Sequence, residues 1–299
     1  MSELIVGIDI GGTKIAGALV DEDGALRSKV VRFATPARSG AEAIVSAVSA
    51  VCCTVTARIS AAAIGIGSAG TFDRNGRVVS ATNVIPGWAG TPLQQLVKAN
   101  TGIPTVVLND VHAAALGEAA FGAGREHPRS LVVAIGTGIG GALVIDGKVD
   151  IGTHGLGGSV GHLPLRRSEG RICSCGGLDH VEAWASGPAL ERRYDPAGVT
   201  GLREIAARAR HGDKPACKVF AEGASALGEG LAAAATMFDP DAIILGGGVA
   251  ALEDLIVAPT RAAFQPELPP LRTIPIIPAE LGSEAAIVGA AHAARLSHG

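Results

Sequence analysis

Two apolar segments separated by a glycine-rich turn form a pattern that occurs twice in this chain. The first copy spans residues 4–20, with its turn at residues 11–14, and the second spans residues 131–145, with its turn at residues 136–141. Short apolar runs that end at glycine turns are typical of buried strands. The repetition therefore predicts an internal duplication with two related lobes, because a solenoid would need many short repeats.

Helices and strands alternate in the rest of the sequence. Helices are expected at residues 41–57, 111–121, 217–238 and 285–296, and further buried strands at residues 61–66, 105–108 and 242–245. Five prolines between Pro266 and Pro278 indicate an extended connector. The alternation implies an α/β fold with mixed or parallel sheets, and 299 residues suit two lobes better than one compact core.

Composition and charge exclude several classes of protein. Hydrophobic residues make up 47% of the chain and charged residues 18%, which excludes general disorder. No apolar stretch reaches the roughly 18 residues needed to cross a bilayer. A net charge of −3 and 3% aromatic residues give no reason to expect nucleic-acid binding. Because there is no secretory signal pattern and five cysteines do not suggest a disulfide framework, we expect a cytoplasmic protein without membrane or nucleic-acid partners. Cys52, Cys53 and Cys217 are expected as buried core thiols.

The first glycine turn, residues 11–14, follows a carboxylate at the end of its strand. Gly11 and Gly12 would let the backbone approach a phosphate and aim amide groups at it, while Thr13 adds a hydroxyl and Lys14 a positive charge. Asp9 is placed to hold Mg²⁺ through water. Taken alone, the same residues also fit a tight hairpin turn without a ligand.

Two further glycine turns offer backbone amides of the same kind. The second glycine turn, residues 136–141, includes Gly136, Thr137 and Gly138, and the third comprises Gly246, Gly247 and Gly248. None is a P-loop, because no Gly-Lys-Ser/Thr follows four residues after a glycine. Residues 65–70 have the Gly-x-Gly-x-x-Gly spacing of dinucleotide-binding proteins, but they lead into another turn rather than a helix.

Asn109 and Asp110 follow a predicted strand directly. Phosphoryl transfer to an alcohol needs a carboxylate near the hydroxyl proton, and Asp110 at a strand end can supply it as a general base. The alternative is that Asp110 caps the helix that begins at Val111, and both roles can coexist.

His162, Cys173, Cys175 and His180 lie within nineteen residues of one another. Thiolates and imidazoles at this density suit a structural, tetrahedral zinc site. The alternative is a pair of surface thiols beside unrelated histidines. A metal here would order the surrounding loop.

With these motifs in this order, the whole chain resembles the ROK family (repressors, open reading frames, kinases) of sugar kinases. The resemblance implies a two-lobed actin-like ATPase (ribonuclease H-like) fold, with duplicated lobes around a cleft. It identifies residues 9–14 with the first phosphate motif, residues 136–141 with the second, residues 246–249 with the adenosine motif and Asp110 with the general base. ATP with Mg²⁺ and a structural Zn²⁺ are the implied cofactors.

The resemblance also implies which residues contact the sugar. These are Gly70, Thr82, Asn83, Asn109, Asp110, Ser159, His162 and Glu182. The chain departs from the family pattern at three of the positions near the sugar and the metal: Ser159 replaces a glutamate, His180 replaces a cysteine and Asp179 replaces a glycine. Ser159 puts plain glucose in doubt, since a smaller side chain could make room for a 2-acetamido group.

The implied activity is ATP-dependent phosphorylation of a hexose at its 6-hydroxyl, of the glucokinase type, with an N-acetylmannosamine kinase as the alternative. A sugar-responsive regulator is disfavoured, because the first phosphate strand begins at Leu4 and leaves no room for a helix-turn-helix. The expected lobes are residues 1–118, rejoined by the helix at residues 284–299, and residues 119–283. A homodimer is usual for the family, and polyphosphate remains an alternative phosphoryl donor.

Overall fold

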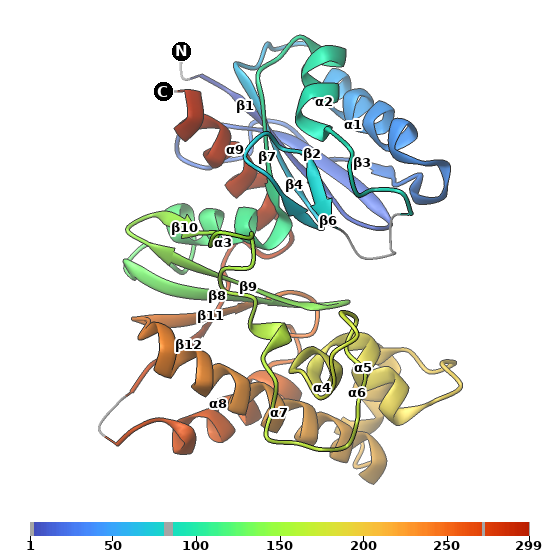
Figure 1. The fold of residues 1–299 in the computed structure, drawn as a ribbon, viewed down its shortest axis with the longest axis vertical. Helices are drawn as coiled ribbons and strands as arrows, with labels where there is room; N and C mark the ends of the chain where they lie inside the picture. The colour runs from blue at the N-terminus through green and yellow to red at the C-terminus, as the bar shows by residue number, and fades with distance from the viewer. Residues whose placement is uncertain (1–2, 81–85, 271–272, 299) are drawn as a thin grey trace. The chain divides into compact units, whose positions relative to one another are not determined.

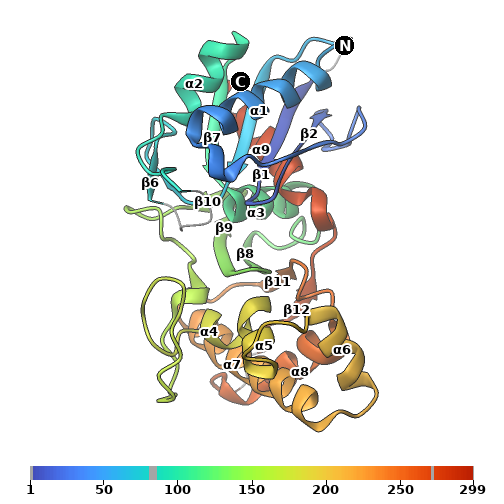
Figure 2. The same cartoon turned by 90° about the vertical axis from the view of Figure 1, so that its right-hand side faces the viewer.

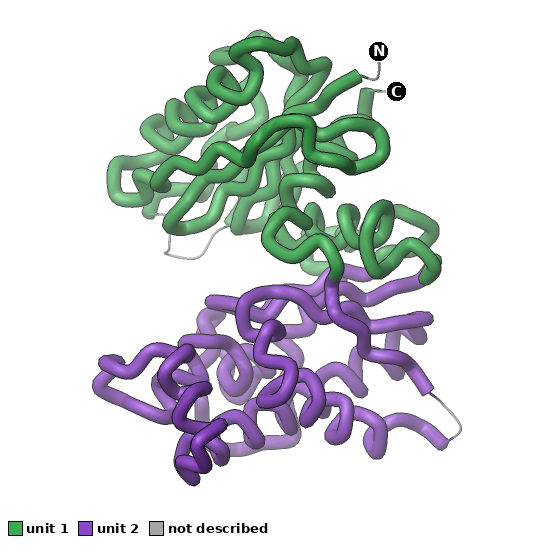
Figure 3. The backbone as a smooth tube through the Cα atoms, turned by 180° about the vertical axis from the view of Figure 1, so that it is seen from behind, with its two compact units in different colours: residues 1–128, 144–157, 280–299 green, residues 129–143, 158–279 purple. Residues whose placement is uncertain are grey.

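A computed structural model describes residues 3–80, 86–270 and 273–298 of the chain, which divides into two compact units. Unit 1 comprises Met1–Pro128, Val144–Gly157 and Glu280–Gly299, and unit 2 comprises Arg129–Leu143 and Gly158–Ala279 (Figure 3). The chain therefore passes from one unit to the other four times. No described helix is both long enough and apolar enough to span a membrane.

The first five-stranded sheet has the order β3-β2-β1-β4-β7 (Figure 1). Its strands are β1 (Ile5–Ile10), β2 (Lys14–Val20), β3 (Val31–Ala34), β4 (Ala63–Ser68) and β7 (Thr105–Asn109). The β1, β4 and β7 strands run parallel, whereas β2 is antiparallel to both β1 and β3. The parallel strands are nearly continuous apolar runs because both faces of the sheet are covered by helices.

Opposite faces of this sheet carry different helices (Figure 1 and Figure 2). The helices of unit 1 are α1 (Ala41–Val55), α2 (Leu93–Thr101), α3 (Asp110–Phe121) and α9 (Ala285–His298). One core joins β-strand residues such as Ile8 to α1 and α2, and another joins alternate strand residues such as Ile5 to α9. A Cβ at Gly65 would lie 1.8 Å from the carbonyl oxygen of Ala290, so only glycine allows α9 to pack this closely. A small two-stranded sheet, β5 (Thr71–Phe72) with β6 (Val78–Ser80), follows β4.

The second five-stranded sheet repeats the order of the first. It runs β10-β9-β8-β11-β12, with β8 (Arg129–Ile135), β9 (Ile139–Ile145), β10 (Lys148–Asp150), β11 (Ala242–Gly246) and β12 (Ile276–Pro278). Parallel pairing of β8 with β11 and of β11 with β12 matches that of β1 with β4 and of β4 with β7. The predicted duplication is therefore present in the strand order. The proline-rich connector is more structured than expected, because residues 276–278 form an edge strand, where proline is tolerated.

The helices of unit 2 are α4 (Glu182–Ala185), α5 (Gly187–Tyr194), α6 (Leu202–Arg210), α7 (Lys214–Phe238) and α8 (Ala258–Phe264). The long helix α7 is capped at its N-terminus by Asp213, whose carboxylate accepts the amide of Ala216 at 2.8 Å, and is followed by Asp239 in the left-handed region. The prediction that three cysteines are core thiols is correct for Cys52 and wrong for Cys53 and Cys217, which are exposed.

Candidate functional site

Parallel pairing in the first sheet brings predicted site residues of unit 1 to one edge. The register places Ile10 opposite Ser68, and Ser68 opposite Asn109, so β1, β4 and β7 end in the same row. Polar side chains that follow parallel strands gather at their carboxyl ends, where α/β proteins bind ligands. Asp9, the first glycine turn and Asp110 therefore lie at this edge.

Asn109, rather than Asp110, caps helix α3. Its Oδ1 accepts the amide of Val111 at 2.9 Å and the amide of His112 at 3.2 Å, while its Nδ2 donates to the carbonyl oxygen of Gly70 at 3.0 Å. Asp110 is the first helical residue, and its Oδ1 also accepts from Val111, at 2.9 Å. Asn109 thus fixes the start of the helix and leaves the Asp110 carboxylate in place for another role.

Burial raises the pKa values of both carboxylates at this edge. Burial, followed by repulsion from Asp110, raises the pKa of Asp9 from 3.8 to about 6, although Lys14 opposes the shift. Burial also raises the pKa of Asp110, against the stabilising hydrogen bonds of the Val111 amide and the Asn109 side chain. A carboxylate with a raised pKa is a stronger base near neutral pH.

The second sheet gathers the other two glycine turns in the same manner. Ala134 of β8 lies opposite Gly246 of β11, so the second and third glycine turns follow adjacent strand ends. Gly247 has a φ of +91°, and a Cβ there would lie 2.4 Å from the carbonyl oxygen of Ile135, so the position requires glycine. The Val249 amide then donates to that same oxygen at 3.0 Å.

Glu182 connects the second glycine turn to the loop at residues 163–181, named here the cysteine loop. Its Oε2 accepts the amide of Ile139 at 2.9 Å, and its Oε1 accepts from the Ser174 hydroxyl and, at 3.4 Å, from the Cys173 thiol. Burial alone would raise the pKa of Glu182, but these hydrogen bonds lower it below the ordinary value. Glu182 is therefore an ionised carboxylate that both elements stabilise.

Four potential metal ligands converge in unit 2. One ligand atom from each of His162, Cys173, Cys175 and His180 lies within 4.8 Å of the others. The Sγ of Cys173 is 3.5 Å from Nδ1 of His162, and the Sγ of Cys175 is 3.3 Å from Nδ1 of His180. Zinc bond lengths of about 2.0–2.3 Å place tetrahedral ligands about 3.5 Å apart. Burial raises the pKa of the Cys173 thiol to about 12, so a cation would have to displace its proton.

The substitution of Asp179 for the glycine of the family pattern has a backbone explanation. Asp179 has a φ of +51°, in the left-handed region that favours glycine and that aspartate tolerates better than most residues. Its carboxylate accepts the amides of Gly170 at 2.8 Å and Arg171 at 3.1 Å. These bonds close the cysteine loop and bring His180 back to the two cysteines.

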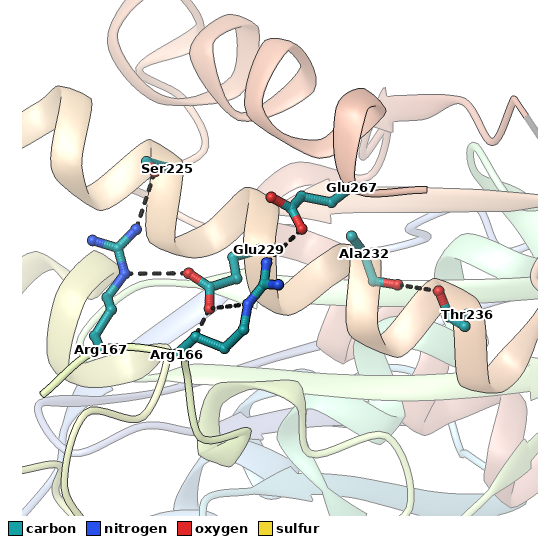
Figure 4. A network of polar contacts seen from close by, with 7 residues as sticks. All are labelled: Arg166, Arg167, Ser225, Glu229, Ala232, Thr236 and Glu267. Atoms are coloured by element: carbon teal, nitrogen blue, oxygen red, sulfur yellow. Dashed lines mark hydrogen bonds and ion pairs between the residues drawn. The ribbon is translucent and has the colours of Figure 1, made fainter. Parts of the chain in front are cut away.

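Arginines anchor the cysteine loop to helix α7 (Figure 4). The backbone amide of Arg166 donates to Glu229 at 2.7 Å, and the Arg166 guanidinium pairs with Glu267 at 2.5 Å. Arg167 pairs with Glu229 at 3.3 Å and donates to Ser225 at 3.0 Å. Arg166 and Arg167 therefore hold the cysteine loop through ion pairs that are partly exposed at the protein surface.

Two predicted sugar contacts, Thr82 and Asn83, lie outside the described residues. Ser159 precedes a short 3-10 turn, Val160–His162, which brings His162 to the other three potential metal ligands. Two contacts at the site were not predicted: the hydroxyl of Thr35 on the first glycine turn and that of Ser174 on Glu182. No local pattern marks either residue. The Thr35 contact depends on how segments 24 residues apart pair, and the Ser174 contact depends on how the cysteine loop folds back toward Glu182.

Known proteins resemble this chain over nearly its full length. Residues 5–296 match the ROK family. A glucokinase of Streptomyces coelicolor is 36% identical, over 98% of this chain and 98% of that protein. An N-acetylmannosamine kinase of Yersinia pseudotuberculosis is 31% identical, over 97% of this chain and 98% of that protein.

The crystal structure of a ROK family glucokinase from Streptomyces griseus in complex with glucose and AMPPNP superposes with a TM-score of 0.85. Its sequence is 37% identical, and the superposition covers 98% of this chain and 99% of that chain. The two sheets of equal strand order are those of the actin-like ATPase fold expected from the sequence. Because the family match spans residues 5–296, the chain belongs to the ROK family.

Proposed function

We propose that this protein transfers the terminal phosphoryl group of ATP to the 6-hydroxyl of a hexose. The observation that carries the proposal is the position of Asp110, a carboxylate of raised pKa at the same strand edge as the first glycine turn. Glucokinases among the similar proteins, at 36% and 37% identity, support a hexose as the acceptor.

Asp110 is proposed to accept the proton of the 6-hydroxyl as that oxygen bonds to the γ-phosphorus and ADP leaves. Asn109 holds Asp110 at the helix start, so the carboxylate need not reorganise during the reaction. Bound Mg²⁺ would neutralise the phosphate charge, and Asp9 is the residue proposed to hold it through water. The amides of the first glycine turn would bind phosphate oxygens.

The second and third glycine turns are proposed to hold the rest of the nucleotide. Gly136, Thr137 and Gly138 offer amides and a hydroxyl after β8, and Gly246, Gly247 and Gly248 offer close backbone approach after β11. Gly247 supports this role, because its left-handed backbone admits no side chain. Polyphosphate as an alternative donor would use only the phosphate-binding turns.

A structural zinc is proposed for His162, Cys173, Cys175 and His180. The donor set fits, since two thiols and two imidazoles within 4.8 Å match the ligands that zinc prefers. Its proposed role is to fix the cysteine loop, from which Ser174 supports Glu182. Glu182 and His162 are proposed to contact the sugar.

The second candidate substrate is N-acetylmannosamine. Ser159, in place of a family glutamate, favours it by leaving space near carbon 2 of the sugar, and a kinase named for that sugar is 31% identical. Glucose remains the first candidate because the more similar proteins are glucokinases. A homodimer is also proposed, and sedimentation velocity would test it.

Sugar-dependent ADP release, measured with Mg-ATP across several sugars, tests the proposal. The panel comprises glucose, mannose, fructose, allose, N-acetylglucosamine and N-acetylmannosamine. The expected result is turnover of one or two of them, with the product phosphorylated at carbon 6. Turnover of none, either with Mg-ATP or with polyphosphate, would refute the proposed function.

A further inference from the structure

Thr35 contacts the first glycine turn from outside it. This half-buried residue follows β3, and its Oγ1 donates to the carbonyl oxygen of Gly11 at 2.7 Å, across 24 residues of sequence. Its amide also donates to the carbonyl oxygen of Thr13, at 3.0 Å. The pairing of Lys14 with Ala34 in neighbouring strands places Thr35 there. One residue therefore holds two carbonyl groups of the turn.

These contacts fix where the amides of the turn point. A peptide unit is planar and trans, so holding the Gly11 carbonyl on one side directs the Gly12 N–H to the opposite side. The Gly11 N–H is already used, because it donates to the carbonyl oxygen of Lys14 at 2.9 Å. Within the described part of the chain, neither Gly12 nor Thr13 donates its amide to a backbone carbonyl.

In the second half of the duplication, the carbonyl of the first glycine of the turn is also held, but by a different donor. Ile10 ends β1 as Ile135 ends β8, so Gly136 corresponds to Gly11. The carbonyl oxygen of Gly136 accepts the amide of Gly187, from the start of α5, at 2.8 Å. In both halves a group outside the turn thus holds the carbonyl of the first glycine.

We propose that Thr35 is a positioning residue for nucleotide binding, a role that rests on the proposed function. Gly11 and Gly12 lack side chains, so their peptide unit can rotate easily. Without the Thr35 hydroxyl, the Gly11 carbonyl is free to turn its oxygen toward the phosphate and the Gly12 amide away from it. Thr35 itself touches no substrate and acts through the turn.

Calorimetric titration with Mg-AMPPNP tests this role without turnover, using Thr35→Val, Thr35→Ser and the control Thr101→Val. Valine keeps the shape of threonine but lacks the hydroxyl, and serine keeps the hydroxyl. Thr101 is matched because its Oγ1 also donates to a backbone carbonyl, that of Val97, at 2.8 Å. Thr35→Val is expected to weaken binding about five- to tenfold, as the loss of one oriented hydrogen bond implies. Thr35→Ser and Thr101→Val are expected to stay within about twofold of the unaltered protein.

The kinetic constants provide the second readout. Thr35→Val should raise KM for Mg-ATP while leaving KM for the sugar nearly unchanged, which general loosening of the fold would not do. Equal nucleotide affinity of Thr35→Val and the unaltered protein, or a failure of serine to restore it, would overturn the proposal. Tight Mg-AMPPNP binding without turnover of any sugar would instead overturn the proposed function, and the titration would still decide the role of Thr35.

Discussion

Replacing Asp9 by asparagine is expected to stabilise the protein while removing its activity. The folded structure raises the pKa of Asp9 from 3.8 to about 6, so its ionised form is unfavourable in the native state. Each unit of pKa corresponds to about 1.4 kcal/mol, which gives a penalty of about 3 kcal/mol at pH values above the folded pKa. Asparagine has nearly the same shape and carries no charge, so it removes this penalty.

The pH dependence has a definite sign. Because the folded pKa lies above the unfolded value, the native state binds more protons between these two values, and its stability falls as pH rises through that window. The gain from Asp9→Asn should therefore be greatest, about 3 kcal/mol, near pH 8 and about half as large near pH 5. The protonated carboxyl in the unaltered protein accounts for the smaller gain in acid.

Urea unfolding followed by circular dichroism, at both pH values, measures the free energy of unfolding. The exposed Asp23→Asn is the control and should change that free energy by less than about 0.5 kcal/mol. Activity of Asp9→Asn should be lost under the same conditions, since its proposed partner is Mg²⁺. A variant that is less stable than the unaltered protein near pH 8, or equally stabilised at both pH values, would refute the reasoning.

Three further substitutions test the candidate site and its support. Asp110→Asn should lower kcat by about 10²–10⁴-fold without unfolding the protein, and an unchanged kcat would exclude it as the base. Cys175→Ala should abolish the zinc content measured by mass spectrometry, whereas the exposed Cys53→Ala should keep one zinc per chain. Glu118→Gln should lower the free energy of unfolding, measured in urea, by about 1–3 kcal/mol. The buried Glu118 carboxylate accepts the amides of Ala123, Glu280 and Leu281, and in glutamine an NH₂ group would face one of these donors.

Local patterns in the sequence were sufficient to predict the strands that carry the site. Residues 4–10 and 131–135 are apolar runs that end at glycine turns, and both are strands in the structure. Parallel pairing then brings Asp9 and Asp110 to one edge, since polar residues that end such strands share it. The convergence of the four cysteine and histidine residues, which are potential metal ligands, was likewise predictable from their short spacing.

Contacts that depend on register could not be predicted in the same way. β3 has only four residues and is mostly exposed, so its sequence gives a weak strand signal, and nothing in the local sequence places Thr35 on the first glycine turn. The choice of Asn109 over Asp110 as the helix cap is also beyond composition, because both residues are good caps. Which of the two residues becomes the cap depends on where along the chain the backbone φ and ψ angles change to helical values.

The two halves of the duplication differ in the charged side chains beside the first and second glycine turns. Asp9 corresponds to Ala134, and Lys14, the first residue of β2, corresponds to Ile139, the first residue of β9. One half therefore keeps a carboxylate and an ammonium group beside its turn, and the other has no charged side chain at the corresponding positions. Charge in the second half comes from Glu182, which reaches the Ile139 amide from outside the strand pair.

Because of Glu182, Gly138 and Gly136 differ in the space available for a side chain, although both lie in the second glycine turn. A Cβ at Gly138 would lie 2.7 Å from Oε2 of Glu182, whereas a Cβ at Gly136 would meet nothing within 4 Å. Gly138→Ala should displace the carboxylate from the Ile139 amide and lower the free energy of unfolding by about 1–3 kcal/mol, and Gly136→Ala should change it by less than about 1 kcal/mol. Urea unfolding of the two variants measures the difference. Equal free energies would mean that the Glu182 side chain moves aside freely, and its link between the turn and the cysteine loop would then contribute nothing to stability.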